Sequence, residues 1–337
     1  AFNLLITGLS GTGKTSVVRL ALRDLETEAQ NNGLGVIVCY VNAQNKQTEY
    51  SILLSILNSL GIKIKNGHTT ASMYNFLREH IKNTHFVAAI DEAQSIDYTD
   101  LGHLLSNLYE TGGEVSAANK NASVSYVLVS NVINLLDGME SKYRSRIGRI
   151  KEIVFKQYTP TQLAAILKSK ADRGLKQTHQ SIINRCAAMI GSDDGNARYA
   201  IETLRSVYEL AEESGCEEIT EDIVVEAFDK VCLDHTNSIV NSLPMRTRLC
   251  LFSVMSLYRS GNSIYSIDAY NKYAYLCKEL RREPLTQRHF LNLIRSLQKT
   301  NLVEFEVISE GRGGRKGIIT LNISDRLIGG IYGNLGE

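Results

Sequence analysis

Apolar and polar positions in residues 1–155 follow two patterns, short β-branched runs and longer stretches of helical periodicity. The apolar runs predict buried strands at residues 2–7, 36–41, 86–90 and 126–130. Helical periodicity predicts helices from residue 16 and at residues 50–60 and 72–81. Strands that alternate with helices favour an α/β domain with a parallel sheet. Two helices separate the second strand from the third, whereas a βαβ unit needs only one.

Between residues 156 and 233 the apolar positions follow helical periodicity alone. Thr159 and Pro160 predict the start of a first helix, because Pro is favoured at the first helical position. Thr220 is the expected N-cap of the last helix. The four helices are expected at residues 160–173, 179–190, 196–214 and 220–228. This part of the chain is therefore expected to be a small helical bundle.

Three further helices and two strands are expected from residue 234 onward. The helices cover residues 247–258, residues 267–280 and a segment opened by Thr286. One face of the third helix is apolar at the spacing i, i+3, i+4, i+7. Its residues are Phe290, Leu293, Ile294 and Leu297. The polar residues that then share the opposite face are Arg288, Asn292, Arg295 and Lys299.

Two apolar strands, at residues 302–308 and 318–323, flank a loop rich in Gly and basic residues. The loop covers residues 309–317 and contains Arg312, Arg315 and Lys316. A helix followed by such a hairpin predicts a winged helix-turn-helix. The helix suits the major groove of DNA, and the basic tip suits the backbone or the minor groove. A winged helix can also be a protein-docking module.

A phosphate-binding loop of the form G-x-x-x-x-G-K-T joins the first strand to the first helix. Its glycines let backbone amides approach phosphate, and the N-terminus of the following helix favours an anion. Lys14 is expected to reach the outer phosphates, and the Thr15 hydroxyl is expected to bind Mg²⁺. The candidate nucleotide-binding residues are Gly8, Ser10, Gly11, Thr12, Gly13, Lys14, Thr15 and Ser16.

Acidic and amide side chains end the two later strands of this block. Asp91 and Glu92 follow the strand at residues 86–90, and Asn131 follows the strand at residues 126–130. The carboxyl ends of parallel strands share one edge of a sheet, so these side chains are expected beside the phosphate loop. Asp91 is then the expected Mg²⁺ ligand, Glu92 the residue that polarises the attacking water, and Asn131 the residue that orients it. Taken alone, an Asp-Glu pair also suits a helix N-terminus, and Ser-Asn suits a turn.

Composition narrows the class of protein only slightly. No apolar run approaches the roughly 18 residues of a membrane span. The six cysteines lie far apart, as is typical of reduced thiols in a cytosol. From Met245 onward 14 Lys and Arg stand against 8 Asp and Glu, whereas the rest holds 23 against 28. A basic C-terminal part suggests that nucleic acid meets this part first. The chain begins at Ala1 without a methionine, so we expect an N-terminal segment to be missing.

Taken in order, the motifs resemble the archaeal replication initiators related to the origin recognition complex and the cell division cycle loader, which are AAA+ ATPases. The resemblance covers nearly the whole chain. Besides the phosphate loop, it rests on Tyr40-Val-Asn42 with Thr48-Glu-Tyr50, Ser130-Asn131, Tyr143-Arg-Ser145-Arg146, Phe155 to Thr159 with Leu163, Gly195-Asn-Ala-Arg198, Leu243-Pro244, and Leu285-Thr-Gln-Arg288.

The resemblance implies roles that the residues alone do not give. Arg198 matches the family's sensor 2, which folds over ATP, and Arg146 matches its arginine finger. Tyr158 is expected to contact the nucleotide. The extra helix before Asp91 matches one that touches DNA in this family. The nucleotide is then expected to set the angle between base and lid, and with it the grip on DNA.

Three departures from the family pattern leave other readings open. Lys142 and Tyr143 replace the Arg and Val that precede the family's finger, and the N-terminal linker that helps to hold adenine is absent. Asp-Glu-Ala-Gln94 replaces the usual Asp-Glu-x-Asp and is also common in transposition and secretion helper ATPases. A helper ATPase is one alternative. A signalling ATPase with a protein-docking winged helix is another, and a clamp-loader subunit would end in a helical collar instead.

The sequence as a whole predicts three domains: an α/β AAA+ P-loop base at residues 1–155, a helical lid at residues 156–233 and a winged-helix DNA-binding domain at residues 234–337. We expect ATP or ADP with Mg²⁺ as cofactors and a weak ATPase that acts as a switch. The expected partners are double-stranded origin DNA, other initiator subunits or paralogues, and a minichromosome maintenance helicase, with no membrane. The expected location is the cytoplasm, associated with the nucleoid.

Overall fold

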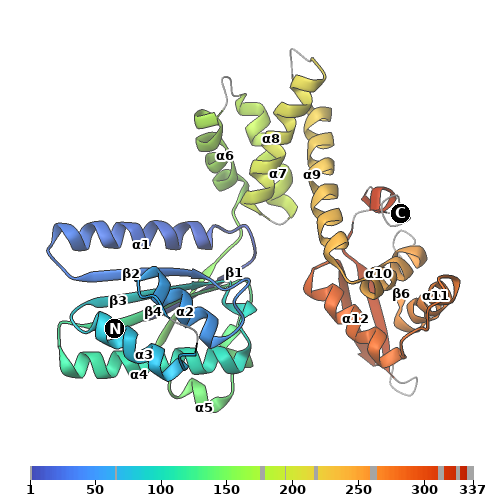
Figure 1. Cartoon of the computed structure of the whole chain (residues 1–337). Helices are drawn as coiled ribbons and strands as arrows, with labels where there is room; N and C mark the ends of the chain where they lie inside the picture. Colours follow the sequence, from blue (N-terminus) through green and yellow to red (C-terminus); the bar gives the residue numbers. More distant parts are fainter. Residues whose placement is uncertain are drawn as a thin grey trace. The chain divides into compact units, whose positions relative to one another are not determined.

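The computed structural model describes residues 2–64, 67–174, 179–193, 195–215, 219–258, 264–309, 315–323 and 327–331. The chain forms two compact units, one made of Ala1–Thr178 with Ala187–Ala200 and the other of His179–Cys186 with Ile201–Glu337. Helices α7 (Gln180–Asp193) and α8 (Ala197–Glu213) contribute residues to both (Figure 1). The division into three domains with the boundaries given above stays a prediction.

A five-stranded parallel sheet forms the centre of the first unit, in the order β2-β3-β4-β1-β5. The strands are β1 (Asn3–Gly8), β2 (Val36–Asn42), β3 (His85–Asp91), β4 (Ser123–Ser130) and β5 (Ile150–Phe155). The expected α/β fold with a parallel sheet is thus confirmed. The carboxyl ends of β1, β3 and β4 lie at one edge of the sheet, which is where the phosphate loop begins.

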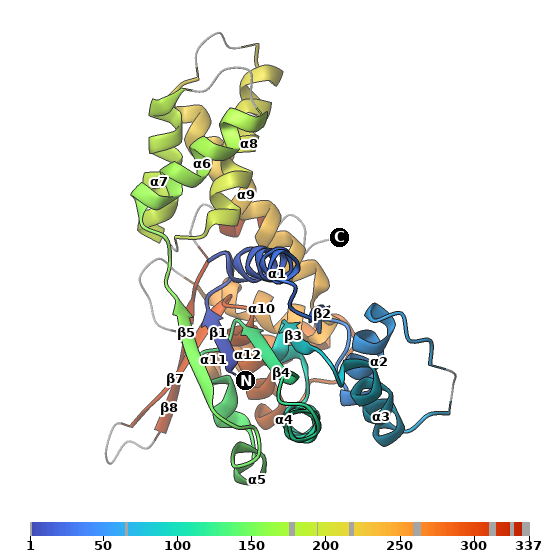
Figure 2. The ribbon, with the colours of Figure 1, turned by 90° about the vertical axis from the view of Figure 1, so that its left-hand side faces the viewer.

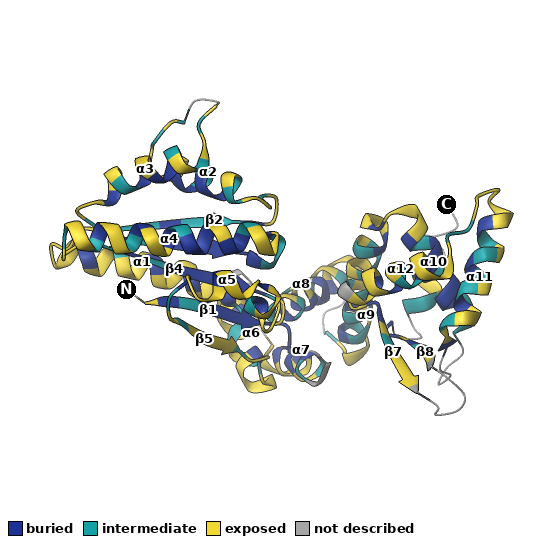
Figure 3. Cartoon of the chain, turned by 90° about the horizontal axis from the view of Figure 1, so that it is seen from below, coloured by how far each residue is buried: buried dark blue, intermediate teal, exposed yellow. Residues whose placement is uncertain are grey.

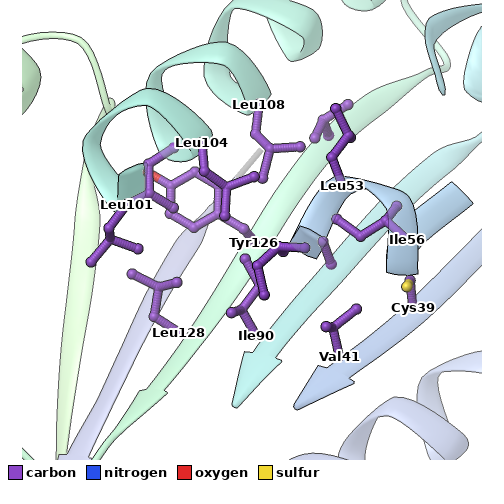
Figure 4. Packing of buried hydrophobic residues seen from close by; sticks show 14 of the residues in the cluster. Cys39, Val41, Leu53, Ile56, Ile90, Leu101, Leu104, Leu108, Tyr126 and Leu128 are labelled. Carbon is purple, nitrogen blue, oxygen red and sulfur yellow. The ribbon is translucent and has the colours of Figure 1, made fainter. Parts of the chain in front are cut away.

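Helices cover both faces of this sheet (Figure 2). Helix α1 (Lys14–Asn31) packs on one face, where Val18 and Leu22 meet Ile6 and Ala89. The other face carries α2 (Glu49–Ser59), α3 (Thr70–Ile81) and α4 (Tyr98–Ala118). Figure 4 shows side chains of this larger core, among them Leu53 of α2 and Leu104 of α4 above the strands. The packing of these buried side chains on the sheet fixes the strands, whose carboxyl ends carry the candidate site residues.

Helix α4 has no counterpart among the helices expected from the sequence. It contains Gly102, Gly112 and Gly113, each of which disfavours a helix by roughly 1 kcal/mol relative to Ala. A fully buried leucine stripe on the sheet side outweighs this cost. The stripe consists of Leu101, Leu104, Leu105 and Leu108. Tertiary packing therefore decides this helix against its local propensity.

The helical part of the chain begins with α6 (Pro160–Gly174), which Thr159 opens as expected. The Thr159 hydroxyl accepts a hydrogen bond from the Gln162 backbone amide, and Gln162 Oε1 accepts one from the Thr159 backbone amide. The helix expected at 220–228 is longer than predicted, since α9 runs from Glu221 to Ser242. No Gly or Pro interrupts those residues, and the helix ends directly before Leu243 and Pro244.

In the second unit, three helices pack on a three-stranded antiparallel sheet in the order β6-β8-β7. The elements are α10 (Met245–Leu257), β6 (Ile264–Tyr265), α11 (Ser266–Glu279), α12 (Gln287–Lys299), β7 (Val303–Ser309) and β8 (Arg315–Leu321). This is the expected winged helix. Strand β8 begins three residues earlier than predicted, because Arg315 pairs with Ser309 and extends the hairpin into the expected loop.

Burial follows the predicted pattern in α12. Phe290, Ile294 and Leu297 are buried, and Phe290 packs against the rings of Tyr270 and Tyr273. The end of β7, by contrast, is exposed, as Figure 3 shows by colour. Across the part of the chain that the structure describes, no helix is both long enough and apolar enough to cross a membrane.

Candidate functional site

The loop between β1 and α1 depends on glycine at three positions. Gly8, Gly11 and Gly13 have φ values of 146°, 76° and 82°, which other residues adopt only with strain. At Gly8 a Cβ atom would lie 2.4 Å from the Phe155 carbonyl oxygen of β5. Gly13 is the left-handed N-cap of α1, so the free amides of the first helical turn follow it directly. The loop has the backbone that phosphate binding requires.

Lys14 lies under this loop rather than in solvent. Its ammonium donates hydrogen bonds to the carbonyl oxygens of Gly8 and Leu9, both at 2.7 Å. Burial lowers the pKa of Lys14, and Arg198 lowers it further, while Glu92 and Asp91 act in the opposite direction. The electrostatic contacts therefore bring the lysine, both acidic residues and the lid arginine into one neighbourhood.

The other polar residues of the loop differ in exposure. The Thr12 hydroxyl is buried and donates to the Leu9 carbonyl oxygen at 2.8 Å. Ser10 and Ser16 are exposed. Thr12 thus stabilises the turn, and the two serines remain accessible to a ligand.

Asp91 is buried at the end of β3 and accepts hydrogen bonds at both oxygens. The Thr15 hydroxyl and the Tyr40 hydroxyl donate to Oδ2, at 2.7 and 2.6 Å. The Glu92 amide donates to Oδ1 at 2.9 Å. A carboxylate beside a hydroxyl is an all-oxygen donor set, which suits Mg²⁺. Thr15 and Asp91 are thus the two residues that fit this ion.

Glu92 has a left-handed backbone, with φ 56° and ψ 38°. Such a conformation costs a residue with a Cβ about 1–2 kcal/mol and is concentrated at functional sites. Its Oε2 accepts hydrogen bonds from the side-chain amides of Gln94, at 2.5 Å, and Asn131, at 3.3 Å. Gln94 also accepts from the Asn131 backbone amide at 3.3 Å. Gln94 therefore bridges the two residues that were expected to handle the attacking water.

The start of α8 packs directly on the phosphate loop. Asn196 caps this helix, because its Oδ1 accepts from the amides of Arg198 and Tyr199. The same oxygen would lie 1.8 Å from a Cβ on Gly11, and the Ala197 amide donates to the Gly11 carbonyl oxygen at 3.2 Å. Only a glycine at position 11 admits this contact, which places the exposed Arg198 beside the loop.

Tyr158 also lies over the loop. Its hydroxyl would lie 2.5 Å from a Cβ on Gly13, and its amide donates to the Gly195 carbonyl oxygen at 3.3 Å. The candidate nucleotide residues on the loop, at the strand ends and at the start of α8 thus lie in one region. Arg146 is bonded elsewhere, since its amide donates to the Tyr143 carbonyl oxygen at 2.8 Å.

Arg146 follows the short helix α5 (Ser141–Arg144) and is exposed. The ring of Tyr143 holds α5 on α4, because Gly102 leaves room for it and the Tyr143 hydroxyl lies 2.9 Å from His103 Nε2. This contact explains how a tyrosine replaces the valine of the family's finger pattern. The role of the exposed Arg146 as an arginine finger stays a prediction.

The candidate DNA-binding residues of α12 are exposed, opposite the buried face. These are Arg288, Asn292 and Arg295, and the Arg295 guanidinium donates to Asn292 Oδ1 at 3.0 Å. Lys316 of β8 is exposed, with its ammonium 5.5 Å from the centre of the Tyr265 ring. Arg312 lies outside the described residues, as do the side chains of Lys299 and Arg315.

Three family models match the chain in consecutive segments. An AAA domain matches residues 2–131, the Cdc6 AAA+ ATPase-type lid domain matches residues 164–229, and the CDC6 C-terminal winged helix domain matches residues 238–328. The chain belongs to the Cdc6 family of AAA+ ATPases. As an AAA+ ATPase it binds ATP and ADP, and the resemblance seen in the sequence is confirmed.

Two ORC1-type DNA replication proteins of archaea resemble this Cdc6-family chain. It is 29% identical to ORC1-type DNA replication protein 1 of Aeropyrum pernix over 330 residues, which are 96% of this chain and 82% of that protein. It is 29% identical to the ORC1-type DNA replication protein of Thermococcus kodakarensis, over 98% of this chain and 81% of that one.

Solved structures show the same fold. The Aeropyrum pernix ORC1 protein, solved in complex with DNA, matches with a TM-score of 0.78 and 27% identity over 99% of this chain and 86% of that chain. The Aeropyrum pernix ORC2 protein matches with a TM-score of 0.62 at 20% identity, over 99% of this chain and 88% of that one. The second match supports the fold alone.

Sequence reasoning did not assign a role to three residues of the nucleotide site. Gln94 was visible only as a departure from the family pattern, and Tyr40 and Asn196 only as parts of matching motifs. Their contacts with Glu92, Asp91 and Gly11 depend on how separate elements pack. A sequence pattern does not contain that information.

Proposed function

We propose that this Cdc6-family chain is a DNA replication initiator, in which bound nucleotide controls the grip on duplex DNA. One observation carries the proposal: a single chain joins a complete phosphate loop to a winged helix whose α12 presents Arg288, Asn292 and Arg295 to solvent. The relative with a TM-score of 0.78, solved with DNA, supports the same arrangement. Helix α12 would enter the major groove, and the hairpin of β7 and β8 would contact the backbone or the minor groove.

Bound Mg²⁺ would neutralise phosphate charge, held by Thr15 and Asp91. Glu92 would act on the attacking water, with Asn131 orienting it. The side-chain amides of Gln94 and Asn131 both donate to Glu92 Oε2, so this oxygen has to give up a hydrogen bond before it can accept one from water. This contact supports a slow ATPase, as a switch needs, rather than a fast one.

The contact between α8 and the phosphate loop supports a mechanism in which the bound nucleotide changes the position of the lid. Asn196 touches Gly11, and Arg198 lies within electrostatic range of Lys14. A phosphate on the loop would attract Arg198, while Tyr158 would contact the same nucleotide. The lid would then move with the state of the nucleotide, and the DNA-binding part would follow.

The partners of this initiator would be origin DNA, other initiator subunits or paralogues, and a minichromosome maintenance helicase. The exposed Arg146 supports the second partner, because it would reach the nucleotide of a neighbouring subunit. Residues 1–155 would form the base, residues 156–233 the lid and residues 234–337 the DNA-binding domain. The protein would work in the cytoplasm, on the nucleoid.

The decisive experiment is capture of genomic DNA. Purified protein with ATP is mixed with sheared DNA from its source, and bound fragments are recovered and sequenced. Sharp enrichment at one or a few loci supports the initiator. Even coverage or no recovery contradicts it and favours a helper ATPase or a signalling ATPase with a protein-docking winged helix.

A further inference from the structure

Oδ2 of Asp91 has one hydrogen-bond partner more than the phosphate loop supplies. Thr15, which follows Lys14 in the loop, donates to Oδ2, and this pair is the usual basis of a magnesium site in P-loop proteins. The same Oδ2 also accepts a hydrogen bond from the Tyr40 hydroxyl, at 2.6 Å against 2.7 Å for Thr15. The tyrosine lies on another strand and belongs to no motif for nucleotide chemistry.

Strand register brings Tyr40 to this place. Tyr40 of β2 pairs with Ala89 of β3, and Asn42 pairs with Asp91. Side chains two residues apart on a strand share a face, so Tyr40 and Asp91 are diagonal neighbours on the side of α1. Ala89, the residue paired with Tyr40, has a small side chain that leaves room for an aromatic ring. A phenol is long enough to cross this diagonal distance, and its hydroxyl then reaches the carboxylate.

A second contact fixes the ring. Arg19 of α1 places its guanidinium carbon 4.3 Å from the centre of the Tyr40 ring. A cation over an aromatic face contributes about 0.5–1 kcal/mol at a site of this kind. Arg19 and Tyr40 thus form a chain of contacts that begins on the helix of the phosphate loop and ends on Asp91.

With Tyr40 and Thr15 on Oδ2 and the Glu92 amide on Oδ1, the carboxylate is held from three directions. Groups that hydrogen-bond a metal ligand orient it and tune its affinity for the ion, and their loss typically costs 10- to 100-fold in metal affinity. We infer that Tyr40 is a positioning residue of the metal site, whose hydroxyl fixes the orientation of Asp91. This inference rests on the proposed binding of Mg²⁺ by Thr15 and Asp91.

The test is metal affinity rather than turnover. Mn²⁺ serves as a paramagnetic substitute for Mg²⁺, and its free concentration is measured by electron paramagnetic resonance during titration of the protein–ADP complex. In Tyr40→Phe the dissociation constant for Mn²⁺ is expected to rise about 10- to 100-fold. The affinity for ADP in excess chelator is expected to stay within about twofold of wild type, because the phosphate loop itself is unchanged.

Tyr74→Phe is the matched control. It also removes a phenol hydroxyl that donates to a carboxylate, at 2.9 Å on Glu49, but at a distance from the loop in sequence and fold. Its Mn²⁺ affinity is expected to equal that of wild type. An unchanged Mn²⁺ affinity in Tyr40→Phe, or an equal loss of metal-free ADP affinity, would overturn the inference.

Arg19→Gln gives a second, independent variant. Loss of the cation over the ring is expected to weaken Mn²⁺ binding about two- to fivefold, the fold-change that corresponds to a cation–π contact. If Tyr40→Phe does not fold, this variant decides alone, and unchanged Mn²⁺ affinity would overturn the inference. Wild-type protein that binds ADP but no Mn²⁺ would instead contradict the proposed metal site. The capture of genomic DNA tests the proposed initiator function separately from both of these results.

Discussion

The phosphate loop and the exposed face of α12 both present charged side chains, but they hold them in opposite ways. At the loop, Lys14 and Asp91 are buried and bonded to other protein groups, with three donors on the carboxylate alone. On α12, Arg288 and Arg295 are exposed. Arg295 is bonded to Asn292, its neighbour on the same helix.

This difference suits the two ligands proposed above, nucleotide for the loop and DNA for α12. A nucleotide is small, and a prearranged site avoids the cost of ordering side chains when it binds. DNA offers a different set of base edges at each step, and long exposed side chains adapt to them while the rigid apolar face keeps the helix in place. Each mutation at the loop should therefore strongly reduce the affinity for nucleotide alone. Each mutation on α12 should reduce the affinity for DNA by a smaller amount.

Replacement of Lys14 by Ala should have the largest effect. The buried ammonium is the main cation of the loop, and loss of one partner of a buried charge pair costs about 2–5 kcal/mol. ATP affinity is expected to fall at least about 30-fold in calorimetric titration, while DNA binding is partly retained. Normal ATP affinity in this variant would refute the assignment of the phosphate loop.

Replacement of Gly11 by Ala tests the packing of α8 on the loop. The new Cβ would meet Asn196 Oδ1, and the backbone at φ 76° disfavours any Cβ, so we expect nucleotide affinity to fall by about 3 kcal/mol. Gly113→Ala is the control, since this glycine of α4 has no atom within 4 Å of its Cβ position. That substitution should leave nucleotide affinity unchanged and raise the free energy of unfolding by about 0.5–1 kcal/mol. Equal nucleotide affinity in both variants would show that α8 does not depend on position 11.

Replacement of Arg288 by Ala should weaken binding to a captured DNA site by about 1–3 kcal/mol and relax the sequence preference at one position. Arg23→Ala removes the same charge from an exposed position on α1 and serves as the control. Fluorescence anisotropy with the site and with a scrambled duplex separates the two effects. If both arginine variants lose affinity equally, α12 contributes charge alone and reads no bases.

The smallest effect is expected for Lys316→Ala. Loss of one phosphate contact should reduce the slope of log affinity against log salt by about 0.9, with little change in sequence preference. Lys168→Ala, at an exposed position of α6, is the matched control. A salt dependence equal to that of wild type would show that the hairpin of β7 and β8 does not contact DNA.

The sequence predicted the elements that carry strong local signals. The glycine spacing located the phosphate loop, and the apolar spacing of Phe290, Ile294 and Leu297 located α12 and its exposed side. These signals suffice because each lies within one element. Four of the five strands of the parallel sheet also followed from their apolar runs. Strand β5 was not predicted, and most of its residues are exposed.

What the sequence did not predict depends on contacts between elements. Helix α4 forms because Leu104 and Leu108 pack on the sheet, although its glycines oppose a helix. Tyr40 reaches Asp91 only through the register of β2 and β3, and Asn196 reaches Gly11 only through the packing of α8. The local pattern around these residues is the same whether or not the contact forms.

The position of β1 in the sheet has a consequence for synthesis on the ribosome. Its two neighbours are β4 and β5, so Leu4 pairs with Val127 and with Lys151. At an elongation rate of about 5–20 residues per second, the first strand to emerge waits roughly 8–30 s for both partners. Strands β2, β3 and β4 can pair in the order in which they appear. The phosphate loop, although it precedes four of the five strands, is thus among the last parts of its unit to be completed.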